Sequence, residues 1–302
     1  MTHTQNEIAG QPGLWRRAAA LAAATDSGAA RALPRPGERV AVVGCGTSWF
    51  IGQSYAALRE QAGHGETDAF AASEFPRGRS YDRVLALSRS GTTTEVLDLL
   101  AGISGHAFAV AITANPDAPI VRAAAEAVVL DFADERSVVQ TRYATTQLAL
   151  LRAHLGEDLS GAIADAEKAL TDPLGRELTG AGQFTFLGRG WTAGLAQEAA
   201  LKMREAAGAW TEAYPAMEYR HGPITITGPG RVAWVFGPAP EGLADDVART
   251  GGLLRVSAAD PMAELIRVQR LAIALAAARG LDPDRPRNLA RSVILRDGGG
   301  GG

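Results

Sequence analysis

The sequence has few of the residues that build disulfides and metal sites. Its 302 residues include one cysteine and five histidines. A single cysteine excludes an internal disulfide and a cysteine-rich zinc site. The histidines show no metal-ligand spacing, so we expect neither a bound metal nor another cofactor. They are His3, His64, His106, His154 and His221.

Long apolar stretches and an excess of charge are also missing. No segment approaches the roughly 18 uncharged apolar residues of a membrane span. The net charge is −3, which does not favour nucleic acid or an anionic membrane as a partner. The opening MTHTQNEIAGQPGLW lacks the basic-then-apolar pattern of a signal peptide. We therefore predict a cytoplasmic protein with no nucleic-acid or membrane partner.

Lysine is rare as well, and its position is informative. The chain has 28 arginines but only two lysines, one of which, Lys202, stands in the segment EAALKMREAA. Glu198, Lys202 and Glu205 are spaced i, i+4, i+7 and share one face of a helix. A solvated ion-pair face is the common alternative. Here the neighbours are mostly apolar, and burial shifts pKa values far enough for a glutamate to accept a carbon-bound proton.

His221 follows in the segment YPAMEYRHGP. Glycine and proline directly after it interrupt both helix and strand, so we expect the histidine to lie in an exposed turn. A purely structural histidine is the usual alternative to a catalytic one.

Short apolar runs alternate with helix-length segments in the first half of the chain. Such runs are typical of strands buried on both faces of a parallel sheet. The expected strands are Val40–Gly44, Val84–Leu87, Phe108–Ile112 and Val128–Phe132. The expected helices are Trp49–Gln61, Thr93–Leu100, Ala118–Glu126 and Val138–Leu155.

The pattern restarts after a connector at residues 156–180. We expect strands at Phe184–Leu187, Val232–Phe236 and Leu253–Val256, and helices at Thr192–Ala207 and Met262–Arg279. The sequence thus predicts an α/β fold of two tandem doubly wound parallel-sheet domains of flavodoxin-like type. Residues 1–35 form an N-terminal lead-in, 36–160 the first domain and 175–297 the second, which is short enough to lack a strand. The ending DGGGGG has nothing to bury, so we expect it to be disordered.

Two turns of the first domain carry a surplus of hydroxyls. VVGCGTSWF (42–50) and LALSRSGTTTEVLDLL (85–100) each end a strand and open a helix. A single hydroxyl caps a helix, which is the common alternative, but the second turn has five in seven residues. Turns at the carboxyl ends of parallel strands converge at a topological switch point. Their hydroxyls and amides predict a phosphate monoester site. The Gly188–Arg189–Gly190 turn lacks the third glycine of a dinucleotide site.

These segments, in this order, resemble the sugar isomerase (SIS) family, in particular the isomerase half of glucosamine-6-phosphate synthase and its stand-alone deaminase relatives. The likeness covers nearly the whole chain. It runs through EIAGQP (7–12), GCGTS (44–48), SRSGTTTE (88–95), ERSVVQTRYATTQL (135–148), FLGRG (186–190), EAALKMRE (198–205), EAYPAMEYRHGP (212–223) and PRNLARSV (286–293).

The resemblance implies a role for each matching residue. Glu205 falls on the base that moves a proton between C1 and C2, Lys202 on the active-site lysine, and His221 on the ring-opening histidine. The family contributes that histidine from the neighbouring subunit, which implies a homodimer with shared active sites. The sugar-phosphate ligands fall on Ser48, Ser88, Ser90 and Thr93. We add Gly46, Thr47, Arg89, Val138 and Arg291 to the expected substrate-binding set.

Three positions depart from the synthase pattern. Arg89 replaces glutamine, which would place a fixed cation beside the phosphate. Thr2 stands where the synthase has its glutaminase cysteine, so we expect no ammonia from glutamine on this polypeptide. Arg291 replaces a lysine linked to sugar binding, and an arginine cannot form an imine with an open-chain ketose.

The expectation is therefore an amino-sugar-phosphate isomerase that works as a deaminase on glucosamine 6-phosphate or a close analogue. No redox cofactor is needed, because the electrons move only between adjacent carbons. Two alternatives remain open. One is a deglycase acting on a fructosamine 6-phosphate, and the other is a non-catalytic sugar-phosphate sensor. The sequence does not reveal which amine-bearing substrate is used, nor the preferred direction.

Overall fold

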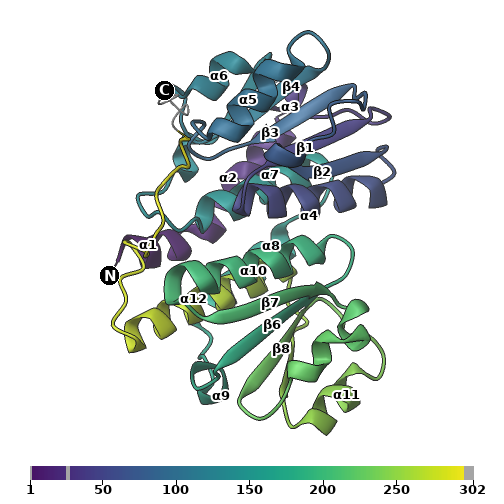
Figure 1. The fold of residues 1–302 in the computed structure, drawn as a ribbon. Coiled ribbons are helices and arrows are strands. Elements are labelled where there is room, and N and C mark those ends of the chain that lie inside the picture. The colour runs from purple at the N-terminus through teal and green to yellow at the C-terminus, as the bar shows by residue number, and fades with distance from the viewer. Residues whose placement is uncertain (1, 25–27, 296–302) are drawn as a thin grey trace, which may run out of the picture.

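The computed structural model describes residues 2–24 and 28–295, whose strands form two wholly parallel sheets (Figure 1). The first sheet has five strands in the order β2-β1-β3-β4-β5. They are β1 (Val40–Gly44), β2 (Thr67–Ala71), β3 (Arg83–Leu87), β4 (Phe108–Thr113) and β5 (Glu126–Val129). The second has four strands in the order β7-β6-β8-β9. They are β6 (Gln183–Gly188), β7 (Trp210–Pro215), β8 (Arg231–Phe236) and β9 (Leu253–Val256). The predicted α/β class and the shorter second sheet are confirmed.

The central strands are buried on both faces because their apolar runs leave no polar side to present to water. In β1, Val40 and Val42 belong to one hydrophobic core, and Ala41 and Val43 belong to another on the opposite face. The strand is paired in parallel with β3, so that Val43 lies opposite Ala86. The carboxyl ends of both strands therefore meet at the same edge of the sheet.

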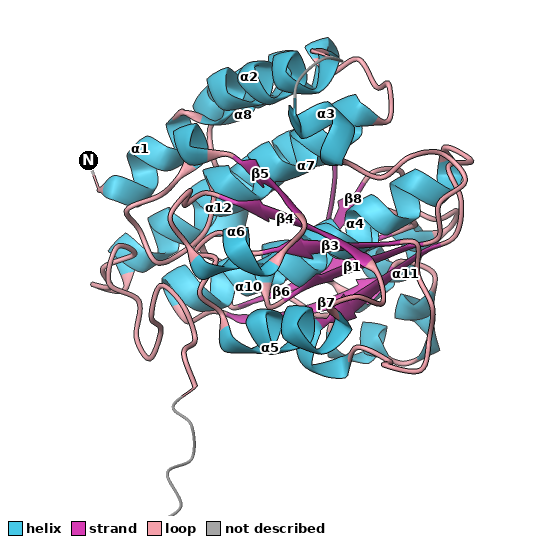
Figure 2. Ribbon diagram, turned by 90° about the horizontal axis from the view of Figure 1, so that it is seen from above, coloured by secondary structure: helices cyan, strands magenta, loops and turns pink. Residues whose placement is uncertain are grey.

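Helices cover both faces of each sheet, and a middle layer of them lies between the two sheets (Figures 1 and 2). The middle layer consists of α2 (Gln11–Ala23), α4 (Thr47–Gln61), α7 (Arg142–His154), α8 (Ser160–Thr171), α10 (Thr192–Ala207) and α12 (Pro261–Ala278). The outer faces bear α5 (Thr94–Ile103) and α6 (Pro119–Ala123) on the first sheet and α11 (Leu243–Thr250) on the second. Short helices complete the fold: α1 (His3–Ala9), α3 (Gly28–Ala32), α9 (Arg176–Thr179), and the 3-10 turns η1 (Ala72–Glu74), η2 (Asp131–Ala133), η3 (Glu218–His221) and η4 (Pro223–Ile226).

The middle layer corrects the prediction of two tandem domains. One hydrophobic core contains Val42 and Leu85 of the first sheet together with Phe186 and Trp234 of the second. Two separate domains would each enclose a core of their own. The described chain is instead a single unit, in which two parallel sheets pack on shared helices.

Two edge strands were not predicted from the sequence: β2 in the first sheet and β7 in the second. Both are partly exposed and carry acidic side chains, Asp68 and Glu212, so they lack a continuous apolar run. The predicted connector at 156–180 contains α8 and α9, and the lead-in contains α1, α2 and α3. The predicted helix at Ala118–Glu126 is shorter, because β5 begins at Glu126.

Within the described ranges, the helices are too short or too polar to cross a lipid bilayer. The glycine-rich ending, for which we expected disorder, lies outside these ranges.

Candidate active site

The first predicted phosphate turn joins β1 to α4 through two glycines. A Cβ on Gly44 would lie 2.8 Å from Cβ of Ser48, which requires glycine at the strand end. Gly46 has a φ of +53°, a conformation that side chains disfavour. The helix is capped by Gly46, and no side chain caps it. The alternative that Thr47 or Ser48 serves as the helix cap is therefore wrong, and both hydroxyls are available for another role.

The second turn joins β3 to α5 at the same edge of the sheet. The hydroxyl of Ser88 accepts a hydrogen bond from the Gly91 amide at 3.1 Å and lies 3.4 Å from Oγ1 of Thr93. Thr93 precedes α5 without capping it through its side chain. The hydroxyls of this turn are thus gathered beside the start of a helix, as an oxyanion site requires.

The C-terminal tail crosses this second turn. The hydroxyl of Ser292 accepts hydrogen bonds from Ser90 at 3.2 Å and from Thr92 at 3.0 Å. The amide of Leu295 donates to Oγ1 of Thr94 at 2.9 Å. The tail runs from the second half of the molecule up to α5 and α6 of the first (Figure 1). Of the hydroxyls that we expected to face a phosphate, the tail therefore contacts that of Ser90.

Arg89 does not present the free cation that we expected. Its side chain is only 1% exposed. The guanidinium donates to the carbonyls of Ser137 at 3.0 Å, of Val138 at 3.3 Å and of Arg291 at 3.3 Å. It also lies 3.5 Å from the Glu135 carboxylate. Arg89 thus joins three segments of the protein to one another, and its charge is already matched by a buried acid.

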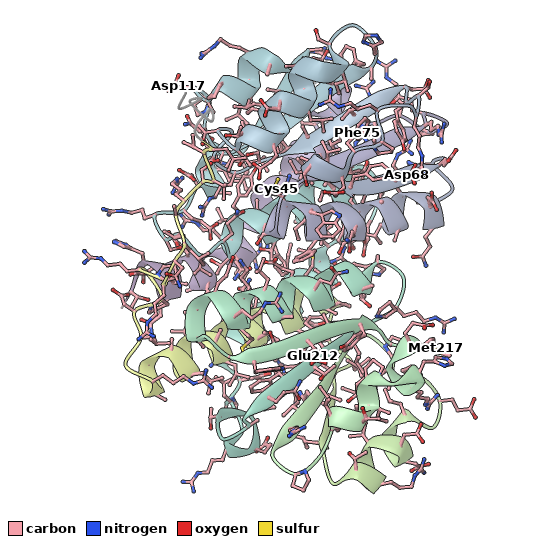
Figure 3. All side chains as sticks on the ribbon, in the orientation of Figure 1. Cys45, Asp68, Phe75, Asp117, Glu212 and Met217 are labelled. Atoms are coloured by element: carbon pink, nitrogen blue, oxygen red, sulfur yellow. The ribbon has the colours of Figure 1, made fainter. Side chains whose placement is uncertain are left out.

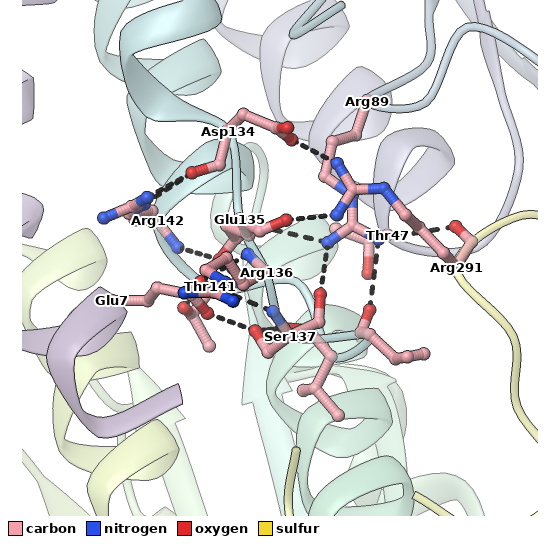
Figure 4. A network of polar contacts seen from close by, with 12 residues as sticks. Glu7, Thr47, Arg89, Asp134, Glu135, Arg136, Ser137, Thr141, Arg142 and Arg291 are labelled. Carbon is pink, nitrogen blue, oxygen red and sulfur yellow. Dashed lines mark hydrogen bonds and ion pairs between the residues drawn. The ribbon is translucent and has the colours of Figure 1, made fainter. Parts of the chain in front are cut away.

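The 134–142 loop that Arg89 holds is fixed from three sides (Figure 4). Glu135 accepts hydrogen bonds from the amide and hydroxyl of Thr141 at 2.6 and 2.8 Å. Burial raises the pKa of Glu135, while Arg89 lowers it. From α1, Glu7 accepts from the Arg136 amide at 2.6 Å. From the tail, Arg291 donates to Asp134 at 2.5 Å.

This loop shows what sequence reasoning missed. Glu7 and Glu135 stood in the quoted segments EIAGQP and ERSVVQTRYATTQL, yet neither was given a role. Each is an acidic residue close to apolar residues in the sequence. That pattern alone does not show that the carboxylate is buried, because its partners can lie far away along the chain. The predicted Arg291 side chain binds the loop, and Val138 contributes its backbone carbonyl.

The acidic face of α10 is buried as the apolar neighbours indicated. Lys202 is 1% exposed, and its ammonium donates to Oγ1 of Thr47 at 3.0 Å and to the carboxylate of Glu205. A carboxylate oxygen of the fully buried Glu198 lies 3.5 Å from the same ammonium. One lysine therefore joins both glutamates to the first hydroxyl turn, and the alternative of a solvated ion-pair face is wrong.

Burial and charge set the protonation of this group in opposite directions. Burial raises the pKa of Glu198 to about 7, although the Lys202 ammonium lowers it. Burial lowers the pKa of Lys202, but the attraction of Glu198 and Glu205 outweighs it and the pKa is raised. Lys202 is therefore a cation at neutral pH, and Glu198 titrates near neutrality.

Glu205 is the more accessible of the two glutamates, with 18% of its side chain exposed. It lines a cavity of about 670 Å³ between the end of α10 and the segment at residues 279–289. Its carboxylate thus contacts a buried ammonium on one side and open space on the other. A base that receives a proton from a bound molecule needs this arrangement.

His221 is exposed, as expected, but this chain does not bring it to Glu205. Its neighbour Tyr219 packs with Leu187 and Val235 on the outer face of the second sheet. The helix α10 packs on the inner face with Phe186. The sheet therefore separates the two groups. Met217, in the same segment, lies at the outer side of the second half, far from Cys45 in the first turn (Figure 3).

Within the described residues, no cluster of three or more histidine, cysteine or acidic side chains is arranged to hold a metal ion. The chemistry that the described side chains can perform is anion binding by hydroxyls and amides, and proton transfer by a glutamate beside a buried ammonium.

No protein-family model matches the chain, but individual proteins are similar to it in sequence and fold. Glutamine–fructose-6-phosphate aminotransferase (isomerizing) of Sulfurisphaera tokodaii, the enzyme called a synthase above, is 31% identical over 298 residues. The match covers 85% of this chain and 50% of that protein. The chain thus spans about half the length of this curated relative.

The solved structures share the fold. Glucosamine-6-phosphate deaminase from Thermotoga maritima superposes with a TM-score of 0.81 at 22% identity, covering 97% of this chain and all of that one. The C-terminal domain of glucosamine-fructose-6-phosphate aminotransferase from Francisella tularensis gives 0.80 at 23%, covering 93% and 97%. In sequence and fold the chain resembles the sugar isomerase (SIS) family. Its homologues are isomerase domains, and its structural neighbours are SIS phosphosugar proteins, so the family resemblance drawn from the motifs is confirmed.

Proposed function

We propose that this SIS protein is an amino-sugar-phosphate isomerase that works as a deaminase. It would convert glucosamine 6-phosphate, or a close analogue, into fructose 6-phosphate and ammonia. The family supports a phosphosugar isomerase, and the deaminating direction and the substrate are our proposal. We further propose a cytoplasmic homodimer, with residues 36–160 and 175–297 as the phosphate-binding and catalytic halves of the unit.

One observation carries the proposal. The Lys202 ammonium contacts both the hydroxyl of Thr47, in the first phosphate turn, and the carboxylate of Glu205. A proton-transfer group therefore lies beside the turn that would hold the anionic end of the substrate. Positioning of this kind converts a bimolecular proton transfer into an effectively unimolecular one.

In the proposed mechanism, the two turns hold the phosphate through Gly46, Ser48, Ser88, Ser90 and Thr93. His221 of a neighbouring copy helps open the sugar ring. Glu205 removes the C2 proton, the C1 carbonyl oxygen takes up a proton from solvent, and C1 and C2 become joined by the double bond of an enolamine. The same carboxylate then delivers the proton to C1 while the amine loses one to solvent. The product is a C2 imine, which water hydrolyses to the ketone and ammonia. Lys202 stabilises negative charge that develops on the intermediate.

The deaminating direction rests on Arg291. The synthase has a lysine at this position, and only a lysine can form an imine with the open-chain ketose. In this chain the guanidinium binds Asp134 and the carbonyl of Glu135, so it fixes the tail to the 134–142 loop. Arg291 would then contribute to the site by holding the tail in place over the second turn.

The test is to incubate the pure protein with glucosamine 6-phosphate and measure ammonia and ketose phosphate together. Glu205→Gln should lose at least about a hundredfold in rate, because general-base catalysis contributes on the order of 10²–10⁴. Glu126→Gln, at an exposed glutamate on β5, is the matched control and should keep the rate of the unmodified protein. Equal rates in both variants would refute the assigned base.

The same experiment separates the alternatives. A deglycase would release an amino acid from a fructosamine 6-phosphate and leave glucosamine 6-phosphate untouched. A sensor would bind sugar phosphates at saturation without turning any of them over.

A further inference from the structure

The second sheet has a cavity of its own, away from Glu205. It has a volume of about 980 Å³, within the range of small-molecule sites. It opens at the carboxyl ends of β6, β8 and β9. Its walls include Arg189, Trp191, Pro238, Ser257, Ala258 and Asp260.

This position is the topological switch point of the second sheet. The strand β6 lies between β7 and β8, so the connections after β6 and β8 lead toward opposite edges of the sheet. They also use opposite faces, because α10 packs on the inner core and α11 on the outer one. Ligands of open parallel sheets bind in the crevice at such a point. The predicted phosphate turns occupy the corresponding point, between β1 and β3, in the first sheet.

The turn after β6 shares its glycines with the first phosphate turn. A Cβ on Gly188 would lie 2.1 Å from the Thr192 carbonyl oxygen, and one on Gly44 would lie 2.8 Å from Cβ of Ser48, so both strand ends require glycine. Gly190 has a φ of +57°, and its counterpart Gly46 has +53°. Strand, glycine, variable residue and glycine therefore follow one another in both halves, and the helix starts one residue later in the second, after Trp191.

The side chains give the cavity a preference for anions. Arg189 is exposed, and its guanidinium forms no hydrogen bond or ion pair with any residue that the structure describes. The acidic residue in the wall, Asp260, is already engaged: it accepts from Arg152 at 3.0 and 2.6 Å and from the Met262 amide at 2.8 Å. The charge available to a ligand is thus that of Arg189.

Apolar surface surrounds that charge. Trp191 lies under the guanidinium of Arg152, 5.0 Å from ring centroid to Cζ, which fixes the indole in the wall. Ala57 and Gln61 of α4 close the far side. The helix α4 begins at the first phosphate turn and ends here, whereas α10 begins here and ends at Glu205.

We infer that this cavity is a second binding site for a phosphate monoester, separate from the candidate active site. The phosphate would bind the Arg189 guanidinium and the Gly190 amide, because the Arg189 amide already donates to Oγ1 of Thr192 at 2.9 Å. The organic part would lie against Trp191. The inference does not depend on the proposed deaminase activity.

The test counts bound ligands in the full chain by equilibrium dialysis with labelled fructose 6-phosphate, and compares affinities with inorganic phosphate. The unmodified protein should bind two molecules of fructose 6-phosphate per chain. Arg189→Ala should weaken the affinity for one of these molecules about tenfold or more, because a charge-assisted hydrogen bond is lost. Ala258→Glu, which adds a carboxylate at an exposed position of the wall, should do the same. Arg122→Ala, at an exposed arginine of α6, is the matched control and should bind two.

A Ser90→Ala variant makes the two sites distinguishable. It should weaken binding in the first half only, and adding Arg189→Ala should weaken the remaining site by the same factor as Arg189→Ala does alone. If both Arg189→Ala and Ala258→Glu bind fructose 6-phosphate like the unmodified protein, the second site is refuted. If the deaminase proposal failed instead, the protein would release no ammonia from glucosamine 6-phosphate, and the binding that depends on Arg189 would be unchanged.

Discussion

Glu198 lies in surroundings very different from those of a glutamate in water. It is fully buried, and its carboxylate makes no hydrogen bond with the described side chains, although the Lys202 ammonium lies 3.5 Å away. Its partner Glu205 shares that ammonium but reaches a cavity. Two glutamates on one helix face thus have different tasks. Glu198 holds the lysine, and Glu205 can meet a substrate.

The raised pKa of Glu198 predicts how stability depends on pH. The group titrates near 4.5 in the unfolded chain and near 7 in the folded one. Between these values the folded protein binds more protons, so the free energy of unfolding falls as pH rises from about 4.5 to 7. Glu198→Gln mimics the protonated form and removes this dependence. The stability of the unmodified protein relative to the variant should therefore drop by roughly 2–3 kcal/mol from pH 5 to pH 8.

Urea unfolding of both proteins at several pH values checks this prediction, with Glu126→Gln measured alongside. A difference between the unmodified protein and Glu198→Gln that stays constant from pH 5 to pH 8 would show that Glu198 does not titrate in this range.

At the same scale, the contacts of the α10 side chains were predicted well from the sequence, and those of the arginines poorly. Lys202 and Glu205 share a helix face, and their meeting follows from a spacing of three residues. Arg89 was expected to meet a phosphate, but its partners Ser137 and Arg291 are 48 and 202 residues away. Local periodicity contains no information about such contacts.

At the scale of elements, the 134–142 loop depends on its buried ion pair. Arg89→Met would leave the Glu135 carboxylate in the interior without a countercharge, which typically costs about 3–5 kcal/mol. Glu135 would retain its bonds to Thr141, so we expect a loss of about 3 kcal/mol in the free energy of unfolding.

The double variant Arg89→Met/Glu135→Gln removes the unmatched charge and should be more stable than the single one. Denaturant unfolding measures both. If the double variant lost the full sum of the two single losses, the pair would contribute no coupling and this account of the loop would be wrong.

Strands and helices were predictable where both faces are buried. β1 matches its predicted range, and α10 does so along its whole length. The edge strand β9 also matches, although it is only partly buried, because three of its four residues are apolar. The edge strands β2 and β7 were missed because they are partly exposed and contain polar residues, so that neither has a continuous apolar run. The helix α2 was missed because its Ala-rich, weakly amphipathic segment gives little periodicity to recognise, and α1 was missed because it is short and mostly polar.

At the scale of the whole molecule, the sheet that separates His221 from α10 bears on assembly. If His221 takes part in ring opening at a site with Glu205, it must come from a second copy of the chain. A His221→Ala variant and a Glu205→Gln variant should each be inactive. Co-expression with two different tags yields hybrid dimers, which have one site with both groups intact.

An equal mixture contains about half hybrids and should show about a quarter of the unmodified activity, whereas the purified hybrids, with one intact site in two, should show about half. The hybrid fraction is purified through both tags and assayed for ammonia. Inactive hybrids would show that the two groups do not act at a shared site.

The prediction of two tandem domains failed at this scale for a physical reason. The repeat of strand and helix patterns marks two sheets correctly, but it does not reveal that α10 and α12 share a core with α4 and α7. A helix that is apolar on more than one side can pack against a single sheet or between two sheets, and its sequence does not distinguish these arrangements.

The most direct measurement of the central claim follows hydrogen exchange rather than ammonia. Fructose 6-phosphate or glucosamine 6-phosphate is incubated with the protein in D₂O, and the C1 and C2 protons are followed by NMR. Proton transfer through Glu205 predicts deuterium at these carbons with the unmodified protein, and at least about a hundredfold slower incorporation with Glu205→Gln. Incorporation at the same rate in both proteins would mean that another group moves the proton.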